Sequence, residues 1–565
     1  MDKQDRSQLG RSAFSVRKKR VNGLRIKHFF SGWGLTTLVF GVLLTFPTAM
    51  LMIRMFRPAN ANWAHIQQFM LTGYLMDTVT LAFWTGAFSV AIGVTLAWLV
   101  SAYQFPFRNT LKWALMLPLA IPPYIGGYTY HGMLNYTSVL QTTLRNRFDI
   151  KVNQNYFDIL NMPGAVFIFT IFLYPYVYAI TRAFLARQAT SLIDNARVLG
   201  SGAFRTFFYV ILPISRASIV GGVSLVILEV LNDYGVVKYF GIQTFSTAIF
   251  QTWFSFGDLD SAIKLAGILM TVVIFIILLE KFLRGRKQFS YSNTKVSPLR
   301  PQPVYGWKKW TIGGFTTTIF ILGFVLPALQ LIYWATLTFD SIYSIAFVRI
   351  IFNSALVATI GAVLVIVFAL IVANFMRMRK GVLSNAIAKL TVLGYSIPGA
   401  VIAVGVISFF IATDEWLFGV YELFGLPPTL LLSTSLTMLL FAYVIRFMAI
   451  GYNSVESGFD KVGTTFTEAS RVLGMSWTAT FFRVDVQLIR PAIFSGFILV
   501  FIDILKELPL TLILRPFNFE TLSTTAYRYA NNEMVQEAAL SSLFITFISA
   551  ISIYMFYHLI EKEPN

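Results

Sequence analysis

Long apolar runs recur along almost the whole chain, and they constrain the fold more than any other feature. A helix that crosses a membrane needs about 20 mostly apolar residues in a row. The first six runs of this kind lie near 31–53, 76–101, 113–134, 163–181, 217–236 and 261–283. The second six lie near 310–335, 351–375, 386–412, 428–450, 492–511 and 538–559. The pattern predicts an all-α integral membrane protein with about 12 transmembrane helices.

Composition excludes the main soluble classes. Hydrophobic residues make up 56% of the 565 residues and charged residues only 13%, whereas soluble domains carry about 25% charged residues. The net charge of +19 is not collected on a polar stretch long enough to bind nucleic acid, so we expect a lipid bilayer and no nucleic acid as surroundings. With no cysteine, the chain has neither disulfides nor thiolate metal sites.

The distribution of Lys and Arg predicts the orientation, because short cytoplasmic loops carry the excess. The tail 1–30 holds nine basic residues, so we place it in the cytoplasm. The first apolar run lacks a clear small-residue cleavage site, and we expect it to be retained as a span. Alternation then puts the C-terminus inside as well, and it makes the loops that begin near 54, 135, 237, 336, 413 and 512 face outward.

A basic, proline-containing segment divides the chain into two halves. The stretch 281–309 has eight basic residues and no acid. We predict a tail at 1–30, a first membrane-spanning half at 31–283, a cytoplasmic linker at 284–309 and a second half at 310–565.

The two halves repeat each other at a spacing of 274 residues. This shift aligns Arg197-Val198-Leu199-Gly200 with Arg471-Val472-Leu473-Gly474, and Phe207-Phe208 with Phe481-Phe482. A repeat with an even number of spans keeps its orientation. We therefore expect two parallel six-helix repeats related by an axis along the membrane normal.

The repeated segment has the composition of a helix that docks on another protein. Asp194 and Glu468 stand near a predicted helix start, where an acid favours the helix dipole, and small residues follow them. Gly200 and Gly474 permit a sharp turn into the next helix. A helical hairpin that only joins two spans could contain the same residues, but two copies on predicted cytoplasmic loops favour docking on a soluble partner.

These segments resemble the EAA loop of ABC-importer permeases, whose pattern is Glu-Ala-Ala, three residues, Gly and a later Leu-Pro. The first copy has Asp-Asn-Ala, Gly200 and Leu212-Pro213, while the second has Glu-Ala-Ser and Gly474 but Val486-Gln487 in place of Leu-Pro. The resemblance implies the type I ABC importer permease fold and two copies of a separate ATPase subunit docked on the loops. The coupling residues that it implies are Asp194, Ala196, Arg197, Gly200, Glu468, Ala469, Arg471 and Gly474.

ATP chemistry is expected to belong to that partner. The chain has no Gly-x-x-x-x-Gly-Lys phosphate loop. We therefore expect no catalytic residue and no bound cofactor in this chain, with ATP used by the partner ATPase.

More narrowly, the chain is similar to fused two-half permeases of ferric-iron importers. The strings that carry the similarity lie at 228–235, 239–241, 244–247, 252–254, 506–509 and 514–519. The similarity implies a bacterial inner-membrane protein with both termini in the cytoplasm, which receives ferric iron from a periplasmic solute-binding protein. Permeases for thiamine, polyamines or phosphonates share part of these strings and remain alternatives. An ion-coupled secondary transporter, which also often has two six-span halves, does not need the repeated docking loop.

Four acidic residues within the spans are candidates for the translocation path. Glu229 and Asp233 stand four residues apart on the fifth predicted span, hence on one helix face, and the 274-residue shift relates them to Asp503 and Glu507. Acids at this depth normally face water or protein, and hard cations prefer oxygen ligands. We assign no metal site firmly, because the acids could instead pair with Lys506 or backbone groups to hold helices together.

Overall fold

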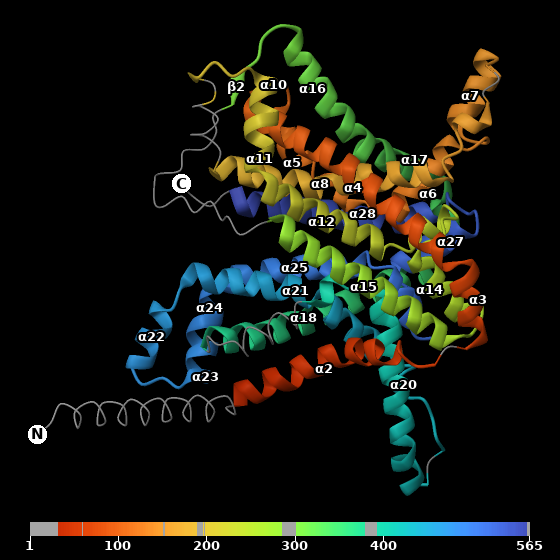
Figure 1. The fold of residues 1–565 in the computed structure, drawn as a ribbon, viewed down its shortest axis with the longest axis vertical. Helices are drawn as coiled ribbons and strands as arrows, with labels where there is room; N and C mark the ends of the chain where they lie inside the picture. Colours follow the sequence, from red (N-terminus) through yellow and green to blue (C-terminus); the bar gives the residue numbers. More distant parts are fainter. Residues whose placement is uncertain are drawn as a thin grey trace, which may run out of the picture. The chain divides into compact units, whose positions relative to one another are not determined.

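The computed structural model describes residues 32–58, 60–150, 153–188, 196, 198–284, 301–378, 393–425 and 427–561. This part of the chain is almost entirely helical (Figure 1). Its strands are two residues long each, where β1 pairs in parallel with β2 in register Tyr103 to Gln302. The predicted all-α fold is confirmed. The predicted tail and most of the predicted linker lie outside the described residues.

The elements that precede the linker are the following. They are α2 (Gly32–Arg54), α3 (Ala61–Phe69), α4 (Leu71–Ala102), β1 (Tyr103–Gln104), α5 (Arg108–Ala114), η1 (Leu117–Ala120), α6 (Pro123–Leu134), α7 (Val139–Phe148), η2 (Gln154–Tyr156), α8 (Met162–Gln188), α10 (Ala203–Thr206), η3 (Phe207–Ile211), α11 (Leu212–Ile214), α12 (Arg216–Asn232), α13 (Gly235–Tyr239), α14 (Phe245–Phe254) and α15 (Leu259–Arg284).

The elements from the end of the linker onward complete the fold. They are β2 (Gln302–Pro303), α16 (Trp307–Phe320), η4 (Ile321–Val325), α17 (Leu326–Ile342), α18 (Ile345–Met378), η5 (Leu393–Ser396), α20 (Gly399–Leu423), α21 (Leu436–Val462), α22 (Thr465–Val472), α23 (Trp477–Thr480), η6 (Phe481–Asp485), α24 (Val486–Leu488), α25 (Arg490–Leu505), α26 (Pro509–Leu514), α27 (Leu522–Asn531) and α28 (Ala538–Glu561).

Most predicted spans are single long helices. Within the described residues, nine helices are long and apolar enough to cross a membrane, or up to eleven if each of two bent helix pairs counts as one span. The bent pairs occupy the fifth and eleventh predicted spans. The third predicted span, near 113–134, is wrong as one continuous helix: α5, η1 and α6 replace it. The physical reason is Pro118, Pro122 and Pro123, which lack a backbone N–H and clash with a preceding helical turn.

The chain divides into two compact units that do not follow the two halves of the sequence. One unit comprises 1–49, 360–395 and 443–500, and the other comprises 50–359, 396–442 and 501–565. In the larger unit, α4, α8 and α12 pack against one another (Figure 1). Small residues permit this approach, since a Cβ at Gly93 or Gly222 would meet Val177 at 2.8 Å. Such packing of small residues is typical of helices in membranes.

The repeat that the sequence predicts recurs in local geometry. The π-helical turns η3 and η6 start at Phe207 and Phe481, 274 residues apart. After each turn the chain bends, by 73° between Phe204–Ile214 and Arg216–Asn232 and by 74° between Trp477–Leu488 and Arg490–Leu505. Two copies of one sequence pattern therefore fold into the same bent element.

Candidate coupling helices and translocation path

The second predicted coupling segment forms a short amphipathic helix, α22. Glu468 lies in its first turn, as expected, where its charge favours the helix dipole. Thr467 and Ser470 are buried, whereas Glu468 and Ala469 are exposed. Glu468 and Ala469 thus lie on the open face of this helix, whereas the small residue Ser470 does not.

Both predicted turn glycines end their helices in the left-handed conformation. Gly200 has φ +78° and Gly474 has φ +88°. The Ser201 N–H donates to the Ala196 carbonyl at 2.9 Å, and the Met475 N–H donates to the Ser470 carbonyl at 3.2 Å. These six-to-one bonds are those of a Schellman cap, which favours glycine at the left-handed position. The predicted sharp turn is confirmed in both copies.

Each turn also displays a pair of apolar side chains. Val198 and Leu199 are each 86% exposed, and Val472 and Leu473 are 87% and 83% exposed. Apolar side chains presented beside an acid and a small residue suit a groove on another protein. These four residues belong to the repeated string that the sequence shows, but they are not among the eight predicted coupling residues.

Of the remaining predicted coupling residues, Arg471 is part of the described structure. Arg471 shapes the turn: its Nη1 donates to the Met475 carbonyl, and its guanidinium lies 4.8 Å from the centre of the Trp477 ring. Asp194 and Arg197 lie outside the described residues.

A buried ion pair anchors α22 from behind. Arg377, near the end of α18, places Nη2 2.7 Å from Asp485 Oδ2 in η6 and donates to the Thr467 hydroxyl at 2.9 Å. The Thr467 hydroxyl in turn donates to Asp485 Oδ1 at 2.6 Å. Position 211, which the 274-residue shift relates to Asp485, holds an isoleucine. This anchor therefore belongs to the second copy.

The predicted path acids Asp233 and Glu507 lie beyond the ends of their helices. Because α12 ends at Asn232 and α25 ends at Leu505, the expectation that Glu229 and Asp233 share one helix face is wrong. Asp233 Oδ1 accepts the Val236 N–H at 2.7 Å and Glu507 Oε1 accepts the Leu510 N–H at 3.3 Å. The physical reason is capping: each carboxylate satisfies a free N–H in the first turn of the next short helix, α13 or α26.

The other two predicted path acids lie within the helices. Glu229 is half-buried in α12, and Asp503 in α25 places Oδ1 2.7 Å from Lys506 Nζ. Lys506 also experiences the charges of Glu229 and Glu507. The four predicted acids thus share one electrostatic environment that includes a cation. Among the described residues, no three His, Cys, Asp or Glu side chains could hold a metal ion together.

The start of α20 meets these helix ends. The Gly399 N–H donates to Asn232 Oδ1 at 2.6 Å. A Cβ placed at Gly399 would lie 3.2 Å from both Asn232 Oδ1 and Glu507 Oε1. Because a side chain would crowd both polar groups, glycine lets the α20 backbone approach the acids closely.

Equivalent hydroxyls hold a short helix in each repeat. The Phe245 N–H at the start of α14 donates to Thr78 Oγ1 at 3.2 Å, and the Leu522 N–H at the start of α27 donates to Ser354 Oγ at 2.7 Å. Both short helices also begin with a capping box, built on Thr244 in one copy and on Thr521 in the other. The two repeats thus position these helices by the same contacts.

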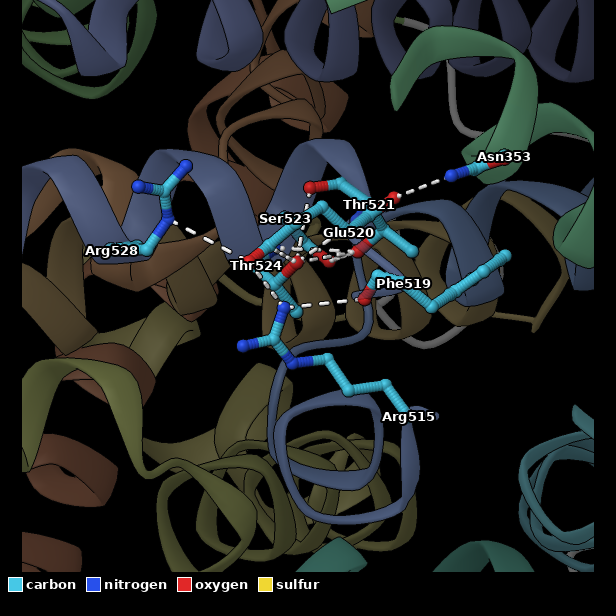
Figure 2. Close-up of polar contacts among 8 residues, drawn as sticks. All are labelled: Asn353, Arg515, Phe519, Glu520, Thr521, Ser523, Thr524 and Arg528. Carbon is cyan, nitrogen blue, oxygen red and sulfur yellow. Dashed lines mark hydrogen bonds and ion pairs between the residues drawn. The ribbon is translucent and has the colours of Figure 1, made fainter. Parts of the chain in front are cut away.

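The loop before α27 contains an ionic cluster. The distribution of Lys and Arg predicts that this loop faces outward. Figure 2 shows Arg515 and Arg528 reaching Glu520 from different directions. Arg515 Nη1 lies 2.6 Å and Arg528 Nε 3.7 Å from Glu520 Oε1, and the Thr524 hydroxyl donates to Glu520 Oε2 at 2.8 Å. The cluster fixes the loop that presents Phe517, which is 94% exposed.

The family model of the "binding-protein-dependent transport system inner membrane component" matches residues 89–280 and 365–564. The two matches cover more than half of the chain and contain both predicted coupling segments. One match lies in each predicted half.

Individual relatives agree with this result. The "Fe(3+)-transport system permease protein FbpB 2" of Haemophilus influenzae is 25% identical over 490 residues, which are 86% of this chain and 88% of that protein. The sulfate transport system permease protein CysT of Escherichia coli is 25% identical over 40% of this chain and 78% of its own length. The molybdenum transport system permease protein ModB of Escherichia coli is 28% identical over 27% of this chain and 64% of its own length. The chain thus belongs to the family of binding-protein-dependent inner membrane components, the non-catalytic membrane-spanning subunits of ABC importers.

Proposed function

We propose that this permease imports ferric iron from a periplasmic ferric-ion binding protein. The observation that carries the proposal is the similarity to the Fe(3+)-transport permease, which extends over 86% of this chain and 88% of the relative. The sulfate and molybdenum permeases match less than half of this chain. Ferric iron is therefore the cargo that this similarity favours.

The acids of the larger unit support a cationic cargo. Glu229, Asp233, Asp503 and Glu507 supply carboxylate oxygens, which hard cations prefer. Lys506 offsets part of their charge through its contact with Asp503. In this proposal the acids lower the barrier for a cation moving through the membrane, and no resident metal site is required.

The coupling segments are the proposed docking sites for two copies of an ATPase subunit. The exposed Val-Leu pairs at 198–199 and 472–473 support this role, because they offer apolar area to a partner groove. The proposed function places the loops of both copies, the linker 284–309, the tail 1–30 and both termini in the cytoplasm. ATP binding and release would then rock the permease halves 31–283 and 310–565 between outward-open and inward-open states.

Uptake of radiolabelled ferric iron by the reconstituted complex tests the cargo and the path. We expect Glu229→Gln combined with Asp503→Asn to abolish uptake, because the path then loses two of its negative charges. Co-purification of the ATPase should stay unchanged. Excess thiamine, polyamine or phosphonate should not compete with iron.

The matched control is Glu280→Gln. Glu280 also lies on a membrane helix and also pairs with a basic residue, Arg284, at 2.5 Å, but it is not among the path acids. We expect normal uptake in this variant. Unaltered iron uptake in the Glu229/Asp503 variant would instead assign these acids to holding helices together.

A further inference from the structure

A cavity of about 680 Å³ lies beside the first bent element, within the larger unit. Aromatic rings dominate its lining: Trp98, Tyr103, Phe204, Phe207, Phe208 and Trp307. Its volume falls within the range of roughly 300–1,000 Å³ that is usual for small-molecule sites. Lys308 is the charged residue of the lining. The site is thus apolar inside, with one cationic group.

Two membrane helices locate this cavity at the boundary between lipid and water. The span Leu71–Ala102 ends beside it, and the span Trp307–Ile342 begins at one of its lining residues. Tryptophan and tyrosine are enriched at this depth. A ligand in the cavity would therefore meet acyl chains on one side and headgroups on the other.

Beside the second bent element, a tryptophan from the first half of the chain fills the corresponding place. The 274-residue shift relates Trp33 to Trp307, and Phe481 to Phe207. The Trp33 ring packs edge-on against Phe481 with centres 4.9 Å apart, and its Nε1 donates to the Thr478 hydroxyl at 3.4 Å. Trp307 instead remains 72% exposed. Trp33 thus fills the place beside the second bent element, whereas the place beside the first bent element stays open.

The two copies also differ in the charge of the residues that follow this tryptophan. Lys308 and Lys309 follow Trp307, whereas Gly34 and Leu35 follow Trp33. The open copy therefore has two basic residues beside the cavity, and the closed copy has none at these positions. Cations beside an apolar cavity at a membrane surface complement a lipid with a negative headgroup.

We propose that this cavity binds an anionic phospholipid of the cytoplasmic leaflet, with an acyl chain among the aromatic rings and the headgroup at Lys308. The assignment to the cytoplasmic leaflet rests on the orientation given in the proposed function. Beside the first bent element, the bound acyl chain would take the place that Trp33 takes against Phe481 beside the second. Because Phe207 and Phe208 begin η3, the lipid would brace the bend between the first coupling segment and α12.

Native mass spectrometry of the full chain in detergent tests the proposal, with phosphatidylglycerol and phosphatidylcholine as the added lipids. We expect phosphatidylglycerol to bind more tightly. Lys308→Gln should weaken phosphatidylglycerol binding roughly fivefold, the effect of one surface lysine, and leave phosphatidylcholine binding unchanged. The matched control is Lys309→Gln. Lys309 does not line the cavity, and its Nζ lies 5.8 Å from the centre of the Trp310 ring. We therefore expect Lys309→Gln to weaken phosphatidylglycerol binding less than Lys308→Gln does.

A second variant tests the cavity itself. Thr311 lines it from α16 and Thr95 from α4, so either Thr311→Trp or Thr95→Trp should fill it and abolish tight binding of phosphatidylglycerol. Two independent positions keep the test decisive if one variant fails to fold. Trp33→Ala should leave lipid binding unchanged. Equal binding of both lipids, or binding that survives both cavity-filling variants, would overturn the proposal.

Labelling separates this proposal from the orientation on which it rests. The chain has no native cysteine, so Tyr305→Cys introduces a single reactive thiol beside the cavity. Labelling only from the cytoplasmic side supports the assigned leaflet. Labelling from outside overturns the leaflet and the proposed orientation together, whereas the mass spectrometry reports lipid binding without transport or ATPase activity.

Discussion

Single residues set the geometry of the coupling turns. Gly200 and Gly474 occupy left-handed conformations, and a Cβ at either position would meet no atom within 4 Å. Glycine is therefore required there by backbone conformation and not by crowding. The exposed Val-Leu pairs immediately before them depend on that conformation for their display.

Replacing both glycines should uncouple the permease from its ATPase. Gly200→Val with Gly474→Val forces a branched residue into the left-handed region, at about 1–2 kcal/mol for each turn. This strain corresponds to roughly a tenfold loss of the docking conformation. ATPase co-purification and ATP-driven uptake measure the loss.

The control for this prediction is Gly425→Val. Gly425 has φ +66° and equally open surroundings, but it lies on a loop predicted to face outward. Gly425→Val should introduce the same backbone strain without affecting co-purification of the ATPase. Equal ATPase co-purification of Gly425→Val and of the Gly200/Gly474 double variant would contradict a coupling role of Gly200 and Gly474.

Asp258 shows how one carboxylate links local structure to pH. It accepts hydrogen bonds from the Ser261 N–H, the Ser261 hydroxyl, Asn62 and Asn60, at 2.7 to 3.0 Å. Burial by itself raises the pKa of Asp258, but these hydrogen bonds outweigh it, so that the pKa lies below its ordinary value. Asp258 thereby joins the start of α15 to α3.

The lowered pKa makes this junction sensitive to acid. A carboxylate with a lowered folded-state pKa stabilises the fold above its unfolded pKa, near 3.9, and this contribution is lost as the pH falls through the folded pKa. We expect the melting temperature of the wild type to fall more than that of Asp258→Asn between about pH 5 and about pH 3. Identical pH profiles of the two proteins would contradict this assignment.

At the scale of elements, the two coupling segments are supported differently. In the smaller unit, α22 rests on Arg377 and Asp485, whose side chains are 14% and 3% exposed. In the larger unit, the first bent element borders the aromatic cavity. The same bent backbone is thus held by a buried ion pair in one copy and borders an open aromatic cavity in the other.

Breaking the buried pair should destabilise α22 selectively. Asp485→Ala leaves the Arg377 charge buried without its partner, which costs about 3–5 kcal/mol. We expect faster amide hydrogen exchange in α22 and a lower melting temperature. Arg377→Leu with Asp485→Leu should recover most of the stability, because replacing both charges by apolar groups is often neutral.

The exposed pair of Glu280 and Arg284 provides the comparison. Both residues lie on α15, and Glu280→Ala removes an exposed pair four residues apart, which is worth only about 0.2–0.5 kcal/mol. Losses of equal size in Asp485→Ala and Glu280→Ala would show that α22 does not depend on its ion pair.

At the scale of the whole molecule, the repeat is expressed as equivalent contacts. Thr78 and Ser354, 276 residues apart, each accept the first N–H of a short helix. The two bends differ by only one degree. Differences between the repeats lie in the side chains added to this common plan, such as Glu520 with its two arginines.

Removing either hydroxyl should have a similar effect on stability. Thr78→Val and Ser354→Ala each leave a buried backbone N–H without an acceptor, which costs about 1–3 kcal/mol. Thermal unfolding measures each loss. Ser408→Ala is the control, because the Ser408 hydroxyl donates to the Val404 carbonyl in its own helix and its removal leaves no N–H unpaired. A large loss in only one of Thr78→Val and Ser354→Ala would mean that the repeats are not held equivalently.

The sequence by itself determined the class of fold, the repeat and the two glycine turns. Apolar runs of sufficient length must become helices in a membrane, where backbone groups find no water, and a glycine at the end of a short helix marks a left-handed cap. Only the tertiary structure decided which acid holds Arg377, what the start of α20 meets and which copy of the bent element stays open. These outcomes depend on contacts between segments far apart in the chain, such as Arg377 with Asp485 or Gly399 with Asn232. Helical periodicity reports only neighbours within one helix, and therefore it cannot predict such contacts.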